Sequence, residues 1–338
     1  MNILDKDNKK TSIYPFVILL IIIFVLSFSL GRYPIDAKTL LKVFLSKILP
    51  IEKSWEDTIE IVVFQVRLPR IIAALLVGLS LSLSGAVYQG MFKNPLVSPD
   101  ILAVSAGSAF GAALAIYFSL TTTGIQAFAF LFGIVAVALV YFISQKIKAD
   151  PIMALVIIGI LIGSLFNSFV SLIKYLADTE DKLPAISFWL MGSLSGVMAR
   201  DIKAVSIPIF LGLVPLYILR WRLNVLTLSE EEAKCLGLDT GKIRLVVIIS
   251  STLMTAAAVS ISCIIGWIGL VIPHLGRILV GPDYRVLIPT TILLGGSYLL
   301  LIDNIARTLT TVEVPLGILT SLIGAPFFIF LLFKRGRS

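Results

Sequence analysis

Long runs of apolar residues fill most of the chain, and short polar segments separate them. The runs are continuously apolar, without the alternation of a half-buried strand, and most approach the roughly 20 residues that a helix needs to cross a bilayer. We therefore predict about ten transmembrane helices. They lie near residues 15–30, 71–89, 101–120, 125–144, 152–173, 205–219, 245–266, 268–280, 287–301 and 315–333. The eighth of these segments is too short to cross alone.

Composition supports a polytopic membrane protein. Of the 338 residues, 58% are hydrophobic and only 14% are charged, and the mean hydropathy is +1.01. Such a chain cannot cover a soluble globule with a normal polar surface. A transmembrane strand barrel is also excluded, because its strands would alternate between apolar and polar positions. The expected fold class is all-α.

Charge in the short loops predicts the topology. A polar head that contains Lys6, Lys9 and Lys10 precedes the first apolar run, which we interpret as a retained helix rather than a cleaved signal peptide. The positive-inside rule then places the N-terminus in the cytoplasm, and an even number of spans places the C-terminus there too. The net charge of +8 is mainly this topology signal, so a nucleic-acid partner is not expected.

A polar segment on the predicted inner side has the pattern of a short capped helix. Ser229 is a suitable N-cap, Glu232 completes a capping box, and Gly237 is a suitable left-handed terminator. Three consecutive glutamates in its first turn favour the positive end of the helix dipole. A simple connector and a helix that docks on another protein both fit this pattern.

Few residues offer covalent or metal chemistry. Cys235 lies in the inner polar segment and Cys263 in a predicted span, so no disulfide is expected. His274 is the single histidine and has no second metal ligand near it in sequence, so no metal site is expected. An intramembrane enzyme would need convergent catalytic groups at membrane depth, which this pattern does not supply.

If the chain is a transporter, its source of energy is not evident within the sequence. Ion-coupled transporters keep ionisable groups at membrane depth, yet the predicted spans contain almost no acids; Asp303 and Glu313 fall at a span end and in an outer loop. A phosphate-binding loop is also absent, because Gly241-Lys242 is followed by Ile243. Uphill transport would therefore need a separate subunit that contacts an inner loop.

The fifth predicted span carries a narrow, mildly polar strip. Gly159, Gly163, Asn167 and Ser171 recur at intervals of four and share one helical face. The strip faces something other than lipid. Close helix packing is one explanation for its glycines.

Several motifs in order along the chain resemble the FecCD family, the permeases of iron-chelate, haem and vitamin B12 ABC importers. The first half contains Arg67-Leu-Pro-Arg70, Gly85-Ala-Val-Tyr-Gln-Gly90, Lys93-Asn-Pro-Leu96 and Leu102-Ala-Val-Ser-Ala-Gly107. The second half contains Trp189-Leu-Met-Gly-Ser-Leu194, Gly266-Trp-Ile-Gly-Leu-Val-Ile-Pro-His274, Asp303-Asn-Ile-Ala-Arg307, Glu313-Val-Pro-Leu-Gly317 and Gly324-Ala-Pro-Phe-Phe328. Two departures are Ala103, where the family usually has Gly, and Ser262-Cys263-Ile264, where it commonly has a Gly-Pro pair before Ile.

The resemblance implies an architecture and partners. It implies one permease domain, residues 1–338, with a cytoplasmic coupling helix at 229–238, working as a homodimer in the cell membrane. Two separate ATP-binding subunits would bind ATP and Mg²⁺, and an extracytoplasmic binding protein would deliver the cargo. The chain itself would be no enzyme and would hold no cofactor.

The resemblance also implies roles for particular residues. Outer arginines would dock acidic residues of the binding protein, although snorkelling to lipid headgroups is an alternative for such cations. The docking arginines are Arg67, Arg70 and Arg307. The residues that would couple to the ATPase are Ser229, Glu230, Glu231, Glu232, Ala233, Leu236 and Gly237. The translocation path would contain Gly159, Gly163, Asn167 and Ser171, and the inner gate would contain Ala149, Asp150, Pro151 and Ile152.

The cargo implied by the resemblance is a ferric siderophore or another bulky metal chelate. Haem, cobalamin and an oxyanion are alternatives within the same family. An ion-coupled secondary transporter is the alternative from a different class.

Overall fold

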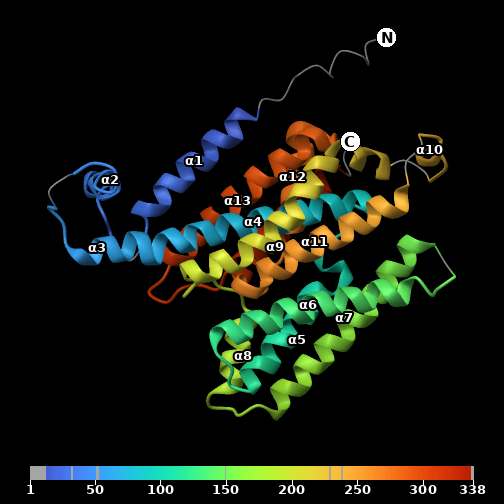
Figure 1. Cartoon of the computed structure of the whole chain (residues 1–338), viewed down its shortest axis with the longest axis horizontal. Helices are drawn as coiled ribbons and strands as arrows, with labels where there is room; N and C mark the ends of the chain where they lie inside the picture. Colours follow the sequence, from blue (N-terminus) through green and yellow to red (C-terminus); the bar gives the residue numbers. More distant parts are fainter. Residues whose placement is uncertain are drawn as a thin grey trace, which may run out of the picture.

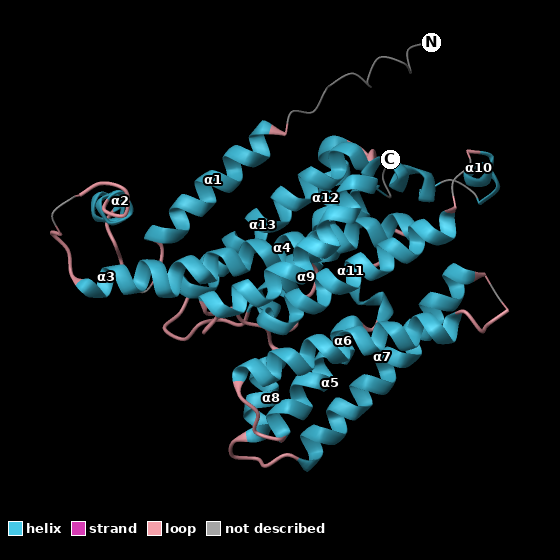
Figure 2. Cartoon of the chain, viewed as in Figure 1, coloured by secondary structure: helices cyan, strands magenta, loops and turns pink. Residues whose placement is uncertain are grey.

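The computed structural model describes residues 13–31, 33–50, 53–148, 150–227, 230–236 and 239–335, and within these ranges it contains helices and no strands (Figure 2). The longer helices are α1 (Tyr14–Ser29), α4 (Leu68–Met91), α5 (Val104–Tyr117), α6 (Thr122–Ser144), α7 (Pro151–Leu176), α9 (Ala199–Ile218), α11 (Thr240–Ser262), α12 (Ile268–Val280), α13 (Tyr284–Thr308) and α14 (Leu316–Arg335). The shorter elements are α2 (Ala37–Leu45), α3 (Asp57–Ile61), η1 (Val62–Arg67), η2 (Pro99–Leu102), α8 (Lys182–Leu190), η3 (Leu219–Thr227) and α10 (Glu230–Cys235).

Each predicted span contains one of the longer helices. Among the described residues, 6 helical stretches are long and apolar enough to cross a membrane, and four shorter apolar helices (α1, α5, α12 and the first part of α14) occupy the remaining predicted positions. The helix α12 has 13 residues, which at about 1.5 Å per residue reaches about two thirds of a roughly 30 Å hydrocarbon core. The all-α fold class is confirmed, whereas the number of crossings stays a prediction.

The second span differs from the prediction at its start. A continuous helical stretch runs from Asp57 to Met91 and comprises α3, η1 and α4. The sequence interpretation placed residues 32–70 in an outer loop. The segment stays helical because residues 59–68 are mostly apolar and contain neither glycine nor proline. The π-helical turn η1 ends at Arg67, three residues before Arg70.

Helices α4, α11 and α13 form the buried centre of the molecule, whereas α6, α7 and α9 leave most of their length exposed. Small residues let the central backbones approach closely. A Cβ atom added to Gly78 would lie 2.3 Å from the carbonyl oxygen of Gly295 on α13, and one added to Gly85 would lie 1.8 Å from that of Gly269 on α12. These glycines are therefore required by helix packing.

Helices α5, α6, α7 and α8 pack together on one side of this centre (Figure 1). The polypeptide enters this group through η2, which returns from the end of α4 and contacts α7. Elements α2 and α3 lie at one end of the bundle, and α10 lies at the opposite end (Figure 1). This separation fits the predicted topology, in which α2 and α3 are outside and α10 is inside.

Candidate functional site

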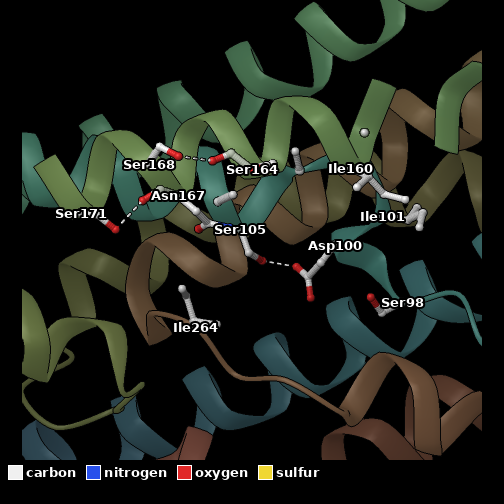
Figure 3. A pocket seen from close by; sticks show the side chains of 14 residues that line it. Ser98, Asp100, Ile101, Ser105, Ile160, Ser164, Asn167, Ser168, Ser171 and Ile264 are labelled. Atoms are coloured by element: carbon white, nitrogen blue, oxygen red, sulfur yellow. Dashed lines mark hydrogen bonds between the residues drawn. The ribbon is translucent and has the colours of Figure 1, made fainter. Parts of the chain in front are cut away.

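A cavity of about 680 Å³ opens between α7 and the segment that leads into α5 (Figure 3). All four predicted path residues lie in its wall. The complete lining is Ser98, Asp100, Ile101, Ala103, Ser105, Ala106, Gly159, Ile160, Gly163, Ser164, Asn167, Ser168, Ser171 and Ile264. The predicted polar strip of α7 therefore faces an open space, while its role in transport stays a prediction.

Local sequence determines where α7 begins. The Asp150 side chain accepts hydrogen bonds from the backbone N–H groups of Ile152 and Met153, each at 2.9 Å, and Pro151 occupies the first helical position. This is the helix start that the Asp-Pro pair predicts. Ala149 lies outside the described residues, so the proposed gate at residues 149–152 stays a prediction.

Hydroxyl groups line the α7 side of the cavity. Ser168 Oγ donates to the Ser164 carbonyl oxygen and Ser171 Oγ donates to that of Asn167, both at 3.0 Å (Figure 3). Each hydroxyl donates its hydrogen bond within the helix and presents oxygen lone pairs to the cavity. The hydroxyl oxygens therefore remain available as weak hydrogen-bond acceptors.

The two glycines in the strip differ in their surroundings. A Cβ added to Gly159 would lie 2.0 Å from the Ile101 carbonyl oxygen, so α7 packs directly on η2 at this residue. A Cβ added to Gly163 would meet only the Ala103 Cβ, at 3.5 Å. Both residues line the cavity, but packing requires glycine only at Gly159, because Gly163 has room for a side chain. Close helix packing therefore explains Gly159 and does not explain Gly163.

The opposite wall is formed by the turn between α4 and α5. Ser105 Oγ donates a hydrogen bond to Asp100 Oδ1, and Asp100 points into the cavity (Figure 3). Sequence reasoning missed Ser98, Asp100 and Ser105 because it treated residues 101–120 as one straight span. A signal was present in the dipeptide before Asp100, since Ser-Pro favours a turn.

Both departures from the family pattern fall where the backbone has positive φ. Ala103 has φ 64° and ψ 17°, and it joins η2 to α5. Cys263 has φ 62° and ψ −155° at the end of α11, a region that is almost exclusive to glycine. Ala103 and Ile264, the residue after Cys263, line the cavity. Two strained backbone positions, Ala103 and Cys263, therefore lie at or next to the lining of the cavity.

The three predicted docking arginines converge at the outer end of the bundle. Arg70 Nη2 lies 2.9 Å from Asp303 Oδ1, and Arg307 Nε lies 3.1 Å from Asp303 Oδ2. A second acid, Glu313, places Oε1 2.9 Å from Arg70 Nη1. Arg67 donates to the carbonyl oxygens of Phe28 and Tyr33.

All three guanidinium groups are buried in this conformation: Arg67 is 4%, Arg70 is 7% and Arg307 is 6% exposed. They are engaged with groups of the same chain, and a partner could reach them only by displacing those groups. Headgroup snorkelling does not fit this burial. The docking role stays a prediction.

The inner polar segment contains α10, shorter than the predicted helix at 229–238. Ser229 and Gly237, its predicted caps, lie outside the described residues, as do the side chains of Glu230 and Glu231. Ala233 is fully buried, whereas Leu236 is 61% exposed and Glu232 is also exposed. Ala233 therefore faces into this chain, and the predicted coupling roles stay predictions. Glu232 and Leu236 face outward.

A hydrogen-bonded clamp fastens the segment before α10 to the start of α13. Asn224 of η3 donates to Asp283 Oδ1 at 2.9 Å and accepts from the Tyr284 backbone N–H at 3.0 Å. The hydrogen bond from Arg285 is the main reason that the pKa of Asp283 falls to about 2, so this carboxylate is ionised at any physiological pH. Sequence reasoning missed the clamp because its partners are about 60 residues apart.

Residues 19–334 match the FecCD transport family. The chain belongs to this family. The molybdate import system permease protein MolB of Haemophilus influenzae is 43% identical over 99% of both chains. A probable iron chelatin transport system permease protein of Helicobacter pylori is 39% identical, covering 82% of this chain and 84% of its own length. A solved inward-facing metal-chelate type ABC transporter has a TM-score of 0.86 and 43% identity, covering 95% of this chain and 98% of that chain.

This FecCD chain is therefore a permease subunit of an ABC importer, and it is a multi-pass protein of the cell inner membrane. The end of the bundle that carries α3 and Arg67 lies opposite the end that carries α10 (Figure 1). Helix α13 joins the outer and inner ends, because it carries Asp303 and Arg307 near one terminus and the Asn224 clamp at the other.

Proposed function

We propose that this permease forms a homodimer that imports a metal chelate, most favourably a ferric siderophore, through a path that includes the cavity beside α7. Two ATPase subunits would bind ATP and Mg²⁺ at the inner side, and an extracytoplasmic binding protein would supply the cargo outside. The observation that carries this proposal is the meeting of the predicted path residues in one cavity wall.

The chemistry of the cavity wall favours weak binding of the cargo, as its passage requires. Hydroxyl, amide and glycine residues are interspersed with alanine and isoleucine along it, and the α7 hydroxyls already donate to their own helix. A solute therefore meets many weak acceptors and few groups that could trap it. The exposed part of α10 supplies a compact surface at the opposite end from α2 and α3, where an ATPase could apply force.

Reconstitution tests the proposal. The permease, its ATPase and its binding protein would be incorporated into proteoliposomes, and uptake of a radiolabelled ferric hydroxamate would be measured. We expect uptake that requires ATP and Mg²⁺ on the ATPase side and is insensitive to ionophores. Uptake that persists without ATP and collapses with an ionophore would favour the ion-coupled alternative. Omitting the binding protein provides the matched control.

Molybdate is a second candidate cargo. It is favoured by the MolB relative, which matches along 99% of both chains. Titration calorimetry of the isolated binding protein against molybdate and against the ferric hydroxamate would separate the two cargoes. The cargo that binds in the micromolar range or tighter identifies the physiological class.

A further inference from the structure

Asp100 is the one ionisable residue among the 14 side chains that line the cavity. It lies on η2, and its side chain points into the open space between Ser98, Ser105 and Ile264 (Figure 3). No Lys, Arg or His lines the cavity, and no cation among the described residues faces this carboxyl group. Its known partner is the Ser105 hydroxyl. A carboxylate accepts about four hydrogen bonds, so most of its capacity remains for a solute.

Asp100 is exposed to this open space, whereas Asp303, a second acid of the bundle, has different surroundings. Asp303 is fully buried and lies within 3.1 Å of two arginines. The charge of Asp303 is therefore balanced within the protein. That of Asp100 faces the cavity without a counterion among the described residues, so it can act on a solute there.

The backbone holds Asp100 rigidly in place. The Ala103 N–H donates to the Asp100 carbonyl oxygen at 2.8 Å, closing η2, and Ala103 itself adopts the strained left-handed conformation that starts α5. On the other side, α7 packs against η2 so closely that Gly159 has no room for a Cβ. The carboxyl group is thus fixed by two helices rather than carried on a mobile loop.

From this placement we propose that Asp100 is a specificity-determining residue of the cavity, which favours cargo that presents cationic or hydrogen-bond-donating groups and disfavours oxyanions. The rest of the wall is neutral, so this carboxylate is the main source of charge there. Charge acts more strongly in a confined space with low-dielectric walls than in bulk water. The inference rests on the proposed function, since it names the chemical class that the path accepts. It favours a neutral or cationic metal chelate over molybdate.

Cysteine reporters measure the charge of the cavity without any cargo. In the assembled importer in nanodiscs, with Cys235→Ser to remove the exposed cysteine, a reporter would be placed by Ser168→Cys or Ser164→Cys. The rates of modification by a cationic and an anionic methanethiosulfonate reagent would be compared with Asp100 and with Asp100→Asn, which keeps the side-chain shape. The protein without a reporter gives the background from buried Cys263.

We expect Asp100→Asn to lower the ratio of cationic to anionic rates about tenfold at both cavity reporters. A matched reporter made by Ile48→Cys, a site 82% exposed at the outer surface, would keep its ratio. A change below twofold at the cavity reporters would overturn the proposal. Failure of both cavity reporters to react would also overturn it, because the proposal requires a cavity open to charged solutes.

Transport gives the second readout. ATP-driven uptake of molybdate and of the cationic chelate ferrioxamine B would be measured in the same proteoliposomes. Asp100→Asn is expected to shift uptake about tenfold toward molybdate, and an unchanged preference would overturn the selectivity role. If the wild-type importer moves neither probe with ATP, the proposed function fails, while the labelling ratios still decide the charge of the cavity.

Discussion

The Arg70 guanidinium lies 2.9 Å from the Glu313 carboxylate, so an ion pair joins the outer end of α4 to the loop before α14. This loop continues into α14, whose first residues donate to a neighbouring segment: the Leu316 N–H bonds the Gly192 carbonyl oxygen at 2.8 Å. The next residue of that segment, Ser193, donates to the Ser262 carbonyl oxygen at 3.0 Å. Contacts thus extend from the arginine cluster to the end of α11 beside the cavity.

Glu313→Gln should strengthen docking of the binding protein. If acidic residues of that partner engage Arg70, Glu313 is their competitor within the chain, and removing its charge frees the arginine. A partly exposed pair of this kind is worth about 1 kcal/mol, which corresponds to about fivefold in affinity. Surface plasmon resonance with the permease in nanodiscs would measure the change.

The control for this experiment is Glu60→Gln, which removes a carboxylate paired with Lys47 elsewhere on the outer surface. It should leave the affinity unchanged. Weaker binding in Glu313→Gln would show that the pair supports the docking surface instead of competing for it. Reversing the three arginines to glutamate is a poor test, because Asp303 and Glu313 would then face three further carboxylates in a buried site.

Gly163→Trp should abolish cargo uptake while assembly with the ATPase remains intact. The indole would project into the cavity, because this position has open space next to it. Gly163→Ala should transport normally. Uptake by proteoliposomes and copurification of the ATPase provide the two measurements, and normal uptake by the tryptophan variant would remove this residue from the path.

Gly159→Ala should instead destabilise the protein. Its Cβ would overlap the Ile101 carbonyl oxygen, so α7 must move away from η2. We expect a loss of roughly 1–3 kcal/mol, the range for overpacking a tight contact, seen as a lower unfolding temperature in detergent. An unchanged unfolding temperature would contradict the close packing seen here.

Ala103→Gly should raise stability. The left-handed conformation costs a residue with a Cβ about 1–2 kcal/mol, which glycine avoids. Glycine also loses more conformational entropy on folding, and this loss offsets part of the gain in stability. The expected net gain is about 0.5–1 kcal/mol, measured as a higher unfolding temperature. The matched control is Ala106→Gly, which lies within α5 and should lose about 1 kcal/mol. Equal effects at the two positions would contradict the assigned backbone conformation.

Asn224→Leu should uncouple ATP hydrolysis from transport. The variant loses both hydrogen bonds of the clamp between η3 and α13 but keeps a side chain with the same branching, so movement of the inner segment would no longer be transmitted to α13. We expect uptake to fall about tenfold while ATP hydrolysis persists. Because the pKa of Asp283 is about 2, the defect should be the same from pH 6 to pH 8.

The control for the clamp is Arg222→Ala, an exposed residue of the same η3 segment whose guanidinium lies over the Trp221 ring. It should retain coupled transport. Parallel loss of hydrolysis and uptake in Asn224→Leu would indicate that the clamp supports folding or ATPase assembly rather than coupling.

The sequence alone determined what depends on neighbours along the chain. Runs of apolar residues located the helices, because each helix satisfies its own backbone in lipid. The Asp150-Pro151 pair located the start of α7, because caps act within one turn. The spacing of Gly159 to Ser171 identified residues that share one face of α7 and line one cavity, because residues four apart align on a helix.

Tertiary structure decided what depends on residues far apart. The Arg70–Glu313 pair spans 243 positions, and no local pattern shows that the arginines are buried against their own acids. The turn at η2 also lies beyond sequence reasoning, because its path into the bundle depends on close packing with Gly159 of α7. That packing forms the second wall of the cavity and sets Asp100 within it. Periodicity fixes which face of a helix is polar, whereas only the packed bundle fixes what that face meets.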